Sequence, residues 1–258
     1  MRGIVIFVAA LIAFAAVPAT ATEPRIALVI GNTAYDGDPL EPLPNATHDA
    51  RLITDVLKEA GFEVIELPDA SRDEMVIGIK EFRQRLLDAG PGAVGLFYFA
   101  GHGLQSYGIN YLLATDAPVE KPEDINRYGF EVDDVLRAML RGGADPNIVI
   151  IDACRPNHVG KILRPVAQAG LREIDARSLD SERSILVAYS TGLGENAADG
   201  EDQNGPYAKV LAENLLTPNL PLGSLFNRVR AQMVRDGLQK PWESNGMLRE
   251  FAFVGEAP

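Results

Sequence analysis

Hydrophobic positions along the chain fall into short apolar runs and longer amphipathic stretches. The short runs are rich in β-branched and aromatic residues, and the run at 93–100 is apolar at nearly every position, as in a central strand covered on both faces. Strands are predicted at residues 25–31, 62–67, 93–100, 147–152, 184–190 and 249–254, with a small hairpin arm at 111–113.

The longer stretches place apolar residues at helical spacing and carry helix start and stop signals. Asn45 is a good N-cap and Gly61 a good stop for the first helix. Ser71 followed by Glu74 is a capping-box pattern at the start of the second. Helices are predicted at residues 45–60, 71–89, 132–141, 206–216 and 222–237.

The alternation of strands and helices predicts an α/β fold with a mainly parallel sheet and helices on both faces. No repeat or change in composition divides the chain, so we expect one folded domain. In such a sheet the active site lies outside the carboxyl ends of the strands. Two predicted strand ends carry residues of catalytic type, a histidine and a cysteine: Ala100-Gly101-His102-Gly103 and Asp152-Ala153-Cys154-Arg155.

The first 21 residues have the pattern of a secretory signal peptide. Arg2 precedes an apolar run from Ile4 to Val17, and Ala19-Thr20-Ala21 offers small residues where a signal peptidase cuts. We expect residues 1–21 to be removed and the domain at 22–258 to be periplasmic or secreted, without stable membrane insertion. The alternative is an uncleaved N-terminal anchor.

The charge of the chain narrows the choice of partners. The formal net charge is −12 at pH 7, and no run of Lys and Arg of the nucleic-acid-binding type is present. Such a chain repels nucleic acid and anionic membrane surfaces, so we expect no nucleic-acid partner and a tolerance for basic partners. The oligomeric state is not indicated.

Cys154 is the only cysteine of the chain. An unpaired thiol in an oxidising compartment favours a functional role, and a buried, inert cysteine is the alternative. A cysteine nucleophile needs an imidazole that favours the thiolate and later protonates the leaving amine. His102, between two glycines after a buried strand, is the candidate; alone it would fit a structural turn histidine. The backbone N–H groups of Gly103 and Cys154 are candidate oxyanion donors.

The segments Phe99-Ala100-Gly101-His102-Gly103 and Asp152-Ala153-Cys154-Arg155 together resemble the His and Cys motifs of caspase-like peptidases. His102 lies 52 positions before Cys154, close to the caspase spacing of about 50. Asp152 stands where animal caspases have Gln, as is typical of metacaspases and of orthocaspases, the bacterial caspase-domain proteins. The resemblance extends over roughly residues 25–255.

This resemblance implies a caspase–haemoglobinase fold with a six-stranded, mainly parallel sheet and helices on both faces. It also implies cleavage after arginine or lysine, with Asp49 and Asp152 lining the pocket for the basic side chain. A buried carboxylate can bind a guanidinium in a bidentate pair. Two alternatives remain: Asp49 complements the dipole of its helix, and Asp152 is a hydrogen-bonded strand-end carboxylate.

Other positions refine the resemblance. Ala100 stands where metacaspases often have Ser, and Ala46 stands where Cys is common. The acidic residues of the family's calcium site are not evident after Cys154, and Asp133 with Asp134 fits a helix start, so we expect no metal and no cofactor.

Three further residues have weaker assignments. Ser190, after the fifth strand, is a candidate for the wall of the substrate cleft. Trp242 is expected to cover the core, and packing over the substrate cleft is the alternative. His158 follows Cys154 in the chain, but we expect no second catalytic role for it.

The sequence therefore predicts a cysteine endopeptidase that cleaves peptides or proteins after basic residues. The segment at 155–183 is basic and irregular at its start, and related enzymes often cut themselves between the halves of the domain, so self-processing there is a further hypothesis. One alternative is a catalytically silent caspase-fold module that binds peptides or proteins. Another is a small-molecule enzyme, for which the chain lacks a phosphate-binding motif.

Overall fold

The computed structural model describes residues 23–107, 109–153, 174, 180, 182–192 and 202–256, and the fold is given for these residues. Their elements follow in chain order: β1 (Arg25–Gly31), α1 (Ala46–Glu59), β2 (Glu63–Pro68), α2 (Arg72–Ala89), β3 (Val94–Ala100), β4 (Gly103–Ser106), β5 (Ile109–Leu112), α3 (Pro122–Tyr128), β6 (Phe130–Glu131), α4 (Val132–Arg141), β7 (Asn147–Asp152), β8 (Ile185–Tyr189), α7 (Pro206–Leu215), α8 (Leu222–Arg235) and β9 (Trp242–Gly246).

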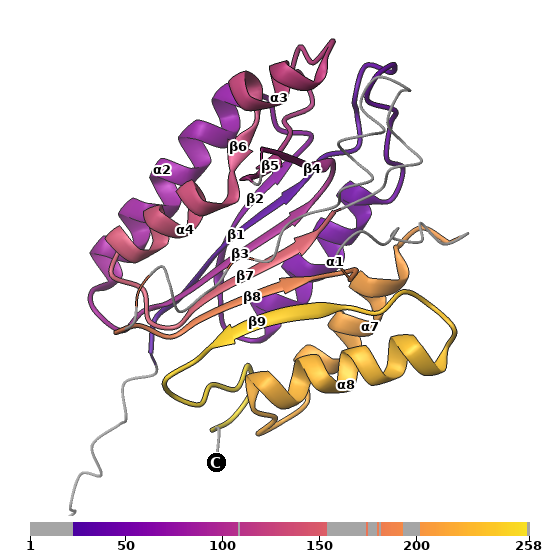
Figure 1. Ribbon diagram of the computed structural model, residues 1–258. Coiled ribbons are helices and arrows are strands. Elements are labelled where there is room, and N and C mark those ends of the chain that lie inside the picture. The colour runs from indigo at the N-terminus through magenta and orange to yellow at the C-terminus, as the bar shows by residue number, and fades with distance from the viewer. Residues whose placement is uncertain are drawn as a thin grey trace, which may run out of the picture.

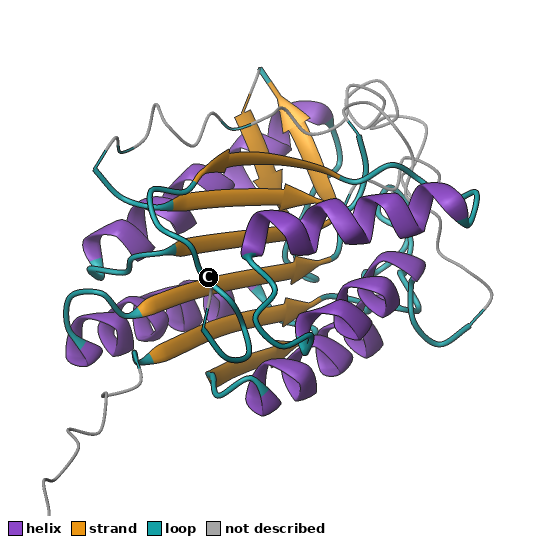
Figure 2. Ribbon diagram, turned by 90° about the horizontal axis from the view of Figure 1, so that it is seen from below, coloured by secondary structure: helices purple, strands orange, loops and turns teal. Residues whose placement is uncertain are grey.

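Six strands form the central sheet in the order β2-β1-β3-β7-β8-β9. The first five run parallel, and β9 pairs antiparallel with β8 at the edge. Helices α1, α7 and α8 cover one face, while α2 and α4 cover the other (Figure 1). Figure 2 shows the strands side by side between these two helical layers. The predicted α/β architecture with a mainly parallel sheet is confirmed.

The two faces of the sheet bury separate apolar cores. Alternate residues of β3 divide between them: Leu96 and Tyr98 face α1 and α7, whereas Phe97 and Phe99 face α2 and α4. All seven residues of β3 are buried, because a central parallel strand is covered on both sides. The same alternation in β7 sends Asp152 to the face of Tyr98.

Local signals explain where the helices begin. The Ser71 hydroxyl accepts a hydrogen bond from the Glu74 N–H, and the Glu74 carboxylate accepts one from the Ser71 N–H at 2.8 Å, so the predicted capping box is confirmed. Asn45, by contrast, has helical backbone angles and makes no side-chain cap bond. The hydroxyl of Thr33 accepts from the Thr47 N–H at 3.0 Å instead, so this donor is satisfied from another segment.

The prediction of a sixth strand at 249–254 is wrong, because that place in the sheet belongs to β9. β9 has a polar sequence, WESNG, and becomes a strand by pairing with the exposed edge of β8. The tail at 249–254 instead buries Phe251 and Phe253 in the core beside α1, α7 and α8. Its carbonyls accept bonds from outside the sheet, such as Leu222 N–H to Phe251 O at 2.8 Å.

A second, three-stranded sheet, β4-β5-β6, stands beside the main one. β4 and β5 form an antiparallel hairpin, which confirms the hairpin arm predicted near 111–113. The short helix α3 and strand β6 were not predicted. Within the described part of the chain, no helix is long and apolar enough to cross a membrane.

Candidate active site

The strand register aligns the two predicted catalytic motifs. β3 and β7 are neighbours, and Ala100 at the end of β3 lies opposite Asp152 at the end of β7. His102 follows Ala100 by two residues, as Cys154 follows Asp152 in the sequence. Cys154 itself lies outside the described residues, as do Lys161, Arg164, Arg172, Arg177 and His158. The described part of the site is therefore built from the His102 side.

The imidazole of His102 is buried and hydrogen-bonded. Only 1% of the residue is exposed, and Nε2 lies 2.8 Å from the backbone carbonyl of Glu41. Because a carbonyl oxygen only accepts hydrogen bonds, this contact requires the proton on Nε2. Nδ1 is then the ring nitrogen that can accept a proton, which is the property a general base needs.

The backbone of His102 is held as firmly as its ring. Its N–H donates to the Tyr35 hydroxyl at 3.0 Å, and its carbonyl accepts from the Leu113 N–H at 3.0 Å. Gly101 is tightly enclosed: a Cβ there would lie 2.7 Å from the Phe99 ring. A residue with a side chain at 101 would therefore displace the turn that carries His102.

Gly103 begins β4 and lies opposite Leu112 of β5. The bond from Leu113 N–H to His102 O shows that this is a non-hydrogen-bonded pair of the antiparallel ladder. The N–H of Gly103 consequently points away from β5. This direction is compatible with the predicted oxyanion donor.

Asp152 is 2% exposed, and its Oδ2 accepts a hydrogen bond from the Tyr98 hydroxyl at 3.0 Å. Burial raises the pKa of Tyr98 well above its usual range, and the nearby charges of Asp152 and Asp49 raise it further. The hydroxyl thus keeps its proton and remains a donor to the carboxylate. The side chains of Asp152 and Tyr98 lie on the α1 and α7 side of the sheet.

Asp49 lies in the first turn of α1 and is fully buried. Its Oδ1 accepts from the Gly205 N–H at 2.7 Å and from Asn204 Nδ2 at 3.1 Å, just before α7. Gly31 allows this end of α1 to approach β1, since a Cβ there would lie 2.5 Å from Ala50 Cβ. Asp49 and Asp152 are both close enough to Tyr98 to raise its pKa, so the structure brings the two carboxylates into one region.

Two buried hydroxyls adjoin this region. Ser190 follows β8 and is fully buried, and its N–H donates to Ile151 O at 3.0 Å. Tyr207 is in the first turn of α7, where burial first and the Asp152 charge second raise its pKa far above the usual range. Neither hydroxyl has a hydrogen-bond partner within the described part of the molecule.

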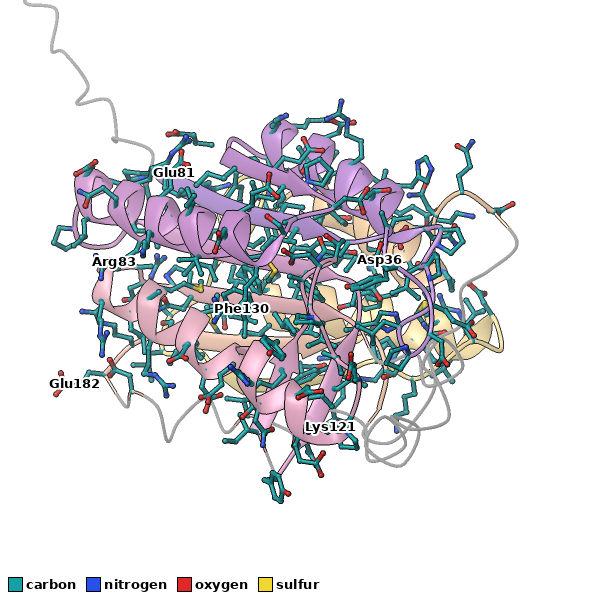
Figure 3. The ribbon with its side chains drawn as sticks, turned by 90° about the horizontal axis from the view of Figure 1, so that it is seen from above. Asp36, Glu81, Arg83, Lys121, Phe130 and Glu182 are labelled. Carbon is teal, nitrogen blue, oxygen red and sulfur yellow. The ribbon has the colours of Figure 1, made fainter. Side chains whose placement is uncertain are left out.

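The loops beyond β1 and β5 add negative charge at the same edge of the sheet. They enclose a cavity of about 260 Å³ whose lining includes Asp36, Asp38, Asp116 and Glu120. In Figure 3, Asp36 lies at the carboxyl end of the sheet. Glu81 and Arg83, which are on α2, lie toward the opposite end. Glu41, whose carbonyl holds His102, belongs to the same connection as Asp36.

Other residues with ionisable side chains have no assigned role in the site. His48, a histidine that the sequence motifs do not include, is exposed on α1, and Asp134 pairs with Arg137 at 2.7 Å at the start of α4. Trp242 is 40% exposed on the edge strand β9, so the prediction that it covers the core is wrong. Among the described residues, no group of three or more His, Cys, Asp or Glu side chains is arranged to hold a metal.

Three contributors were not predicted: Tyr35, Glu41 and Tyr98. Tyr98 stands in the middle of an apolar strand, where a single hydroxyl is a weak signal. Tyr35 and Glu41 lie in the connection between β1 and α1, 67 and 61 positions before His102. Glu41 contributes only its backbone carbonyl, and because every residue has one, the sequence carries no signal for this contact.

The geometry agrees with comparisons to known proteins. A model of the caspase domain family matches residues 24–253. The mucosa-associated lymphoid tissue lymphoma translocation protein 1 homolog of Mus musculus is 29% identical over 199 residues, covering 74% of this chain and 21% of that protein. The Homo sapiens protein is also 29% identical over 199 residues, covering 22% of its length. The chain thus spans about a fifth of the length of these curated relatives.

Solved structures share the fold. A crystal structure of a protein from Geobacter sulfurreducens matches with a TM-score of 0.63 at 20% identity, covering 91% of this chain and 98% of that one. Caspase-1 from Spodoptera frugiperda matches with a TM-score of 0.65 at 17% identity, covering 91% of both chains. At these identities the likeness concerns the fold alone.

Proposed function

Because the chain belongs to the caspase domain family, we propose that it is a cysteine endopeptidase with His102 and Cys154 as its catalytic pair. The observation that carries the proposal is the register of β3 and β7. Ala100 lies opposite Asp152, and each precedes one member of the pair by two residues. The ends of adjacent parallel strands meet at one edge of the sheet, where active sites of such folds lie.

The hydrogen bond to the His102 imidazole assigns a separate role to each ring nitrogen in the proposed mechanism. With Nε2–H donating to Glu41 O, Nδ1 takes the proton of the Cys154 thiol, and the thiolate attacks the substrate carbonyl carbon. The N–H groups of Gly103 and Cys154 stabilise the oxyanion that forms. The imidazolium then gives its proton to the leaving amine, and water hydrolyses the acyl-enzyme. The Glu41 carbonyl stabilises the imidazolium in the role that a carboxylate has in other triads.

The proposed specificity is for arginine or lysine before the cut bond. Asp152 and Asp49 are both buried near Tyr98, and two carboxylates in one region favour a cationic side chain that enters it. Each carboxylate is oriented, Asp152 by Tyr98 and Asp49 by Gly205. Ser190, which directly follows β8 and donates to Ile151 O of β7, is a further proposed contact in the substrate cleft.

A pair of fluorogenic peptides, with arginine or aspartate before the reporter, tests the proposal. The unsubstituted protein should cleave the arginine peptide, while Cys154→Ala and His102→Ala should each be inactive with an unchanged melting temperature. An intact protein that binds such peptides without cleaving them would instead be a silent caspase-fold module. Faster cleavage of the aspartate peptide would refute the acidic pocket.

Self-processing is proposed for the basic segment that follows Cys154. Its candidate positions are Lys161, Arg164, Arg172, Arg177 and Arg183. Arg183, the described one, is tied to Leu140 O at 2.7 Å, so we expect it to be the poorest substrate. Mass spectrometry of the active protein beside Cys154→Ala should show fragments ending at these residues only in the active sample.

Export is proposed from the signal-peptide pattern of residues 1–21. The expected mature N-terminus is Thr22, so the domain at 22–258 would act in the periplasm or outside the cell. N-terminal sequencing of the protein recovered from the periplasm or medium checks this. Recovery of a chain that begins at Met1 from the membrane fraction would favour the anchored alternative.

A further inference from the structure

Tyr35 makes more contacts with His102 than the proposed mechanism uses. It belongs to the connection between β1 and α1 and is 3% exposed. Its hydroxyl accepts from the His102 N–H at 3.0 Å and donates to the Leu113 carbonyl at 3.0 Å. The Leu113 N–H in turn donates to the His102 carbonyl at 3.0 Å. These three bonds close a ring that holds both backbone groups of His102.

The same tyrosine touches the imidazole. The two rings meet edge to face, with centroids 4.4 Å apart and an interplanar angle of 66°. The imidazole is also held through Nε2 by Glu41 O. The imidazole therefore has two contacts: Glu41 O at Nε2 and the Tyr35 ring in an edge-to-face arrangement. Together these contacts set the direction in which Nδ1 points.

The segment that supports Tyr35 is itself hydrogen-bonded through Asn32. Asn32 donates through Nδ2 to the same Leu113 carbonyl at 3.1 Å, and its Oδ1 accepts from the Ala70 N–H at 2.9 Å. The Asn32 N–H donates to Ala100 O at 2.9 Å. A Cβ at Gly101 would lie 2.8 Å from the Tyr35 hydroxyl, so the hydroxyl takes the space that a side chain at 101 would need.

We propose that Tyr35 is a positioning residue whose hydroxyl fixes the backbone of His102 and whose ring orients the imidazole for proton transfer. The inference rests on the proposed peptidase function for its kinetic consequence. In this proposal Tyr35 acts through His102. Small displacements of a general base reduce proton transfer steeply, because the reaction needs a short, aligned approach.

Tyr35→Phe tests this by removing only the hydroxyl. We expect kcat for an arginine peptide to fall about 10- to 100-fold with a smaller change in KM. The pH midpoint for alkylation of Cys154 by iodoacetamide should rise, because a misplaced imidazolium stabilises the thiolate less. The matched control is Tyr111→Phe, which removes one hydroxyl from another buried tyrosine, 4% exposed.

Equal losses of kcat in Tyr35→Phe and Tyr111→Phe would overturn the proposal, since the effect would then be general destabilisation. An unchanged kcat together with an unchanged alkylation profile in Tyr35→Phe would overturn it as well. A loss of kcat and a raised midpoint confined to Tyr35→Phe would support it.

A second measurement is independent of activity. In a Cys154→Ala background, nitrogen NMR of the histidine side chains should show the His102 Nε2–H as a slowly exchanging signal, identified by its loss in His102→Ala. Tyr35→Phe should shift this signal and speed its exchange. If the unsubstituted protein cleaves nothing, the peptidase proposal fails while this signal still decides the role of Tyr35; an identical signal in both proteins would overturn that role.

If Tyr35→Phe does not fold, amide hydrogen exchange of the unsubstituted protein serves instead. The His102 amide, which donates to the Tyr35 hydroxyl, should exchange as slowly as its neighbours in β3. Exchange at the rate of an unprotected amide would overturn the hydrogen bond on which the proposal depends.

Discussion

At the scale of single residues, the carboxyl edge of the sheet combines one imidazole, two buried carboxylates and several tyrosine hydroxyls. Each of these ionisable side chains has a hydrogen-bond partner: His102 has Glu41 O, Asp152 has Tyr98, and Asp49 has Gly205. Buried charges need such partners because water no longer solvates them. The consequence is that conservative substitutions, which keep volume and remove one polar atom, should have measurable effects.

Asp152→Asn should reduce cleavage of arginine peptides by about a hundredfold or more, because losing one partner of a buried charge pair costs on the order of 3 kcal/mol. Peptide kinetics with arginine substrates measure the loss. Asp55→Asn, an exposed carboxylate on α1, is the control and should leave the rate unchanged. An Asp152→Asn protein as active as the original would mean that Asp152 does not bind the substrate.

The buried tyrosines predict a loss of stability at high pH. Burial raises the pKa of Tyr98 and Tyr207 in the folded state, so above the ordinary value of about 10 the unfolded chain releases protons that the folded chain keeps. Each tyrosine then lowers the free energy of unfolding by about 1.4 kcal/mol per pH unit. Denaturant unfolding between pH 9 and 11.5 should show this decline, with a shallower slope in Tyr207→Phe. Tyr107→Phe, at an 85% exposed residue, should leave the slope unchanged, and an equal slope in all three proteins would contradict the assignment.

At the scale of elements, the end of β3 and the hairpin that follows it carry the site. β3 lies between β1 and β7, so its end is fixed on both sides by parallel pairing. The chain then turns through Gly101 and His102 into β4, which pairs with β5. The position of His102 is thus set by two sheets at once, and the turn between them has little freedom.

Gly101→Ala should reduce peptidase activity strongly while leaving most of the fold in place. The added methyl would meet the Phe99 ring at 2.7 Å and the Tyr35 hydroxyl at 2.8 Å, so the turn must shift. A shift of this kind can cost about a hundredfold in rate. Gly223→Ala in α8, where the methyl would be 3.4 Å from Asn245 Nδ2, is the control and should retain activity. Equal activity in both variants would show that the turn tolerates a side chain.

At the scale of the whole molecule, Arg25 joins the first strand to the end of the described chain. Its guanidinium donates to the carbonyls of Ala60, Ala252 and Phe253, and it stacks over Phe62 and Phe251 at 5.8 and 5.1 Å. Burial lowers the pKa of Arg25, with Glu23 opposing this effect. The contact lies at the amino ends of the parallel strands, opposite the candidate active site.

Arg25→Met should lower the melting temperature by roughly 5 to 10 °C, because it leaves three carbonyls without their donor at a cost of about 2 to 3 kcal/mol. The specific activity of the remaining folded protein should be unchanged. Calorimetry with a peptide assay measures both quantities. Arg228→Met, at an exposed arginine on α8, should melt like the original protein. A melting temperature that is lowered equally in the two variants would contradict the special role of Arg25.

The sequence by itself determined which segments form most elements, and it supplied the candidate residues for the proposed chemistry. Periodicity is local, so β1, β3, β7 and the main helices follow from it to within a residue or two. His102 became a candidate because a Gly-His-Gly segment follows a buried strand, and Cys154 because it follows another in the sequence. The motif spacing then indicated the caspase domain family, which the family model confirms.

Only the tertiary structure decided the rest, because the remaining choices depend on contacts between distant residues. The polar segment Trp242–Gly246 became the sixth strand since the edge of β8 offers unpaired backbone groups, while the apolar tail at 249–254 was needed in the core. The hydrogen bonds of Tyr35 and Glu41 to His102 join residues that are more than 60 positions apart in the sequence. Hydrogen-bond partners of this kind are chosen by the packing of layers, and neither periodicity nor motif spacing encodes them.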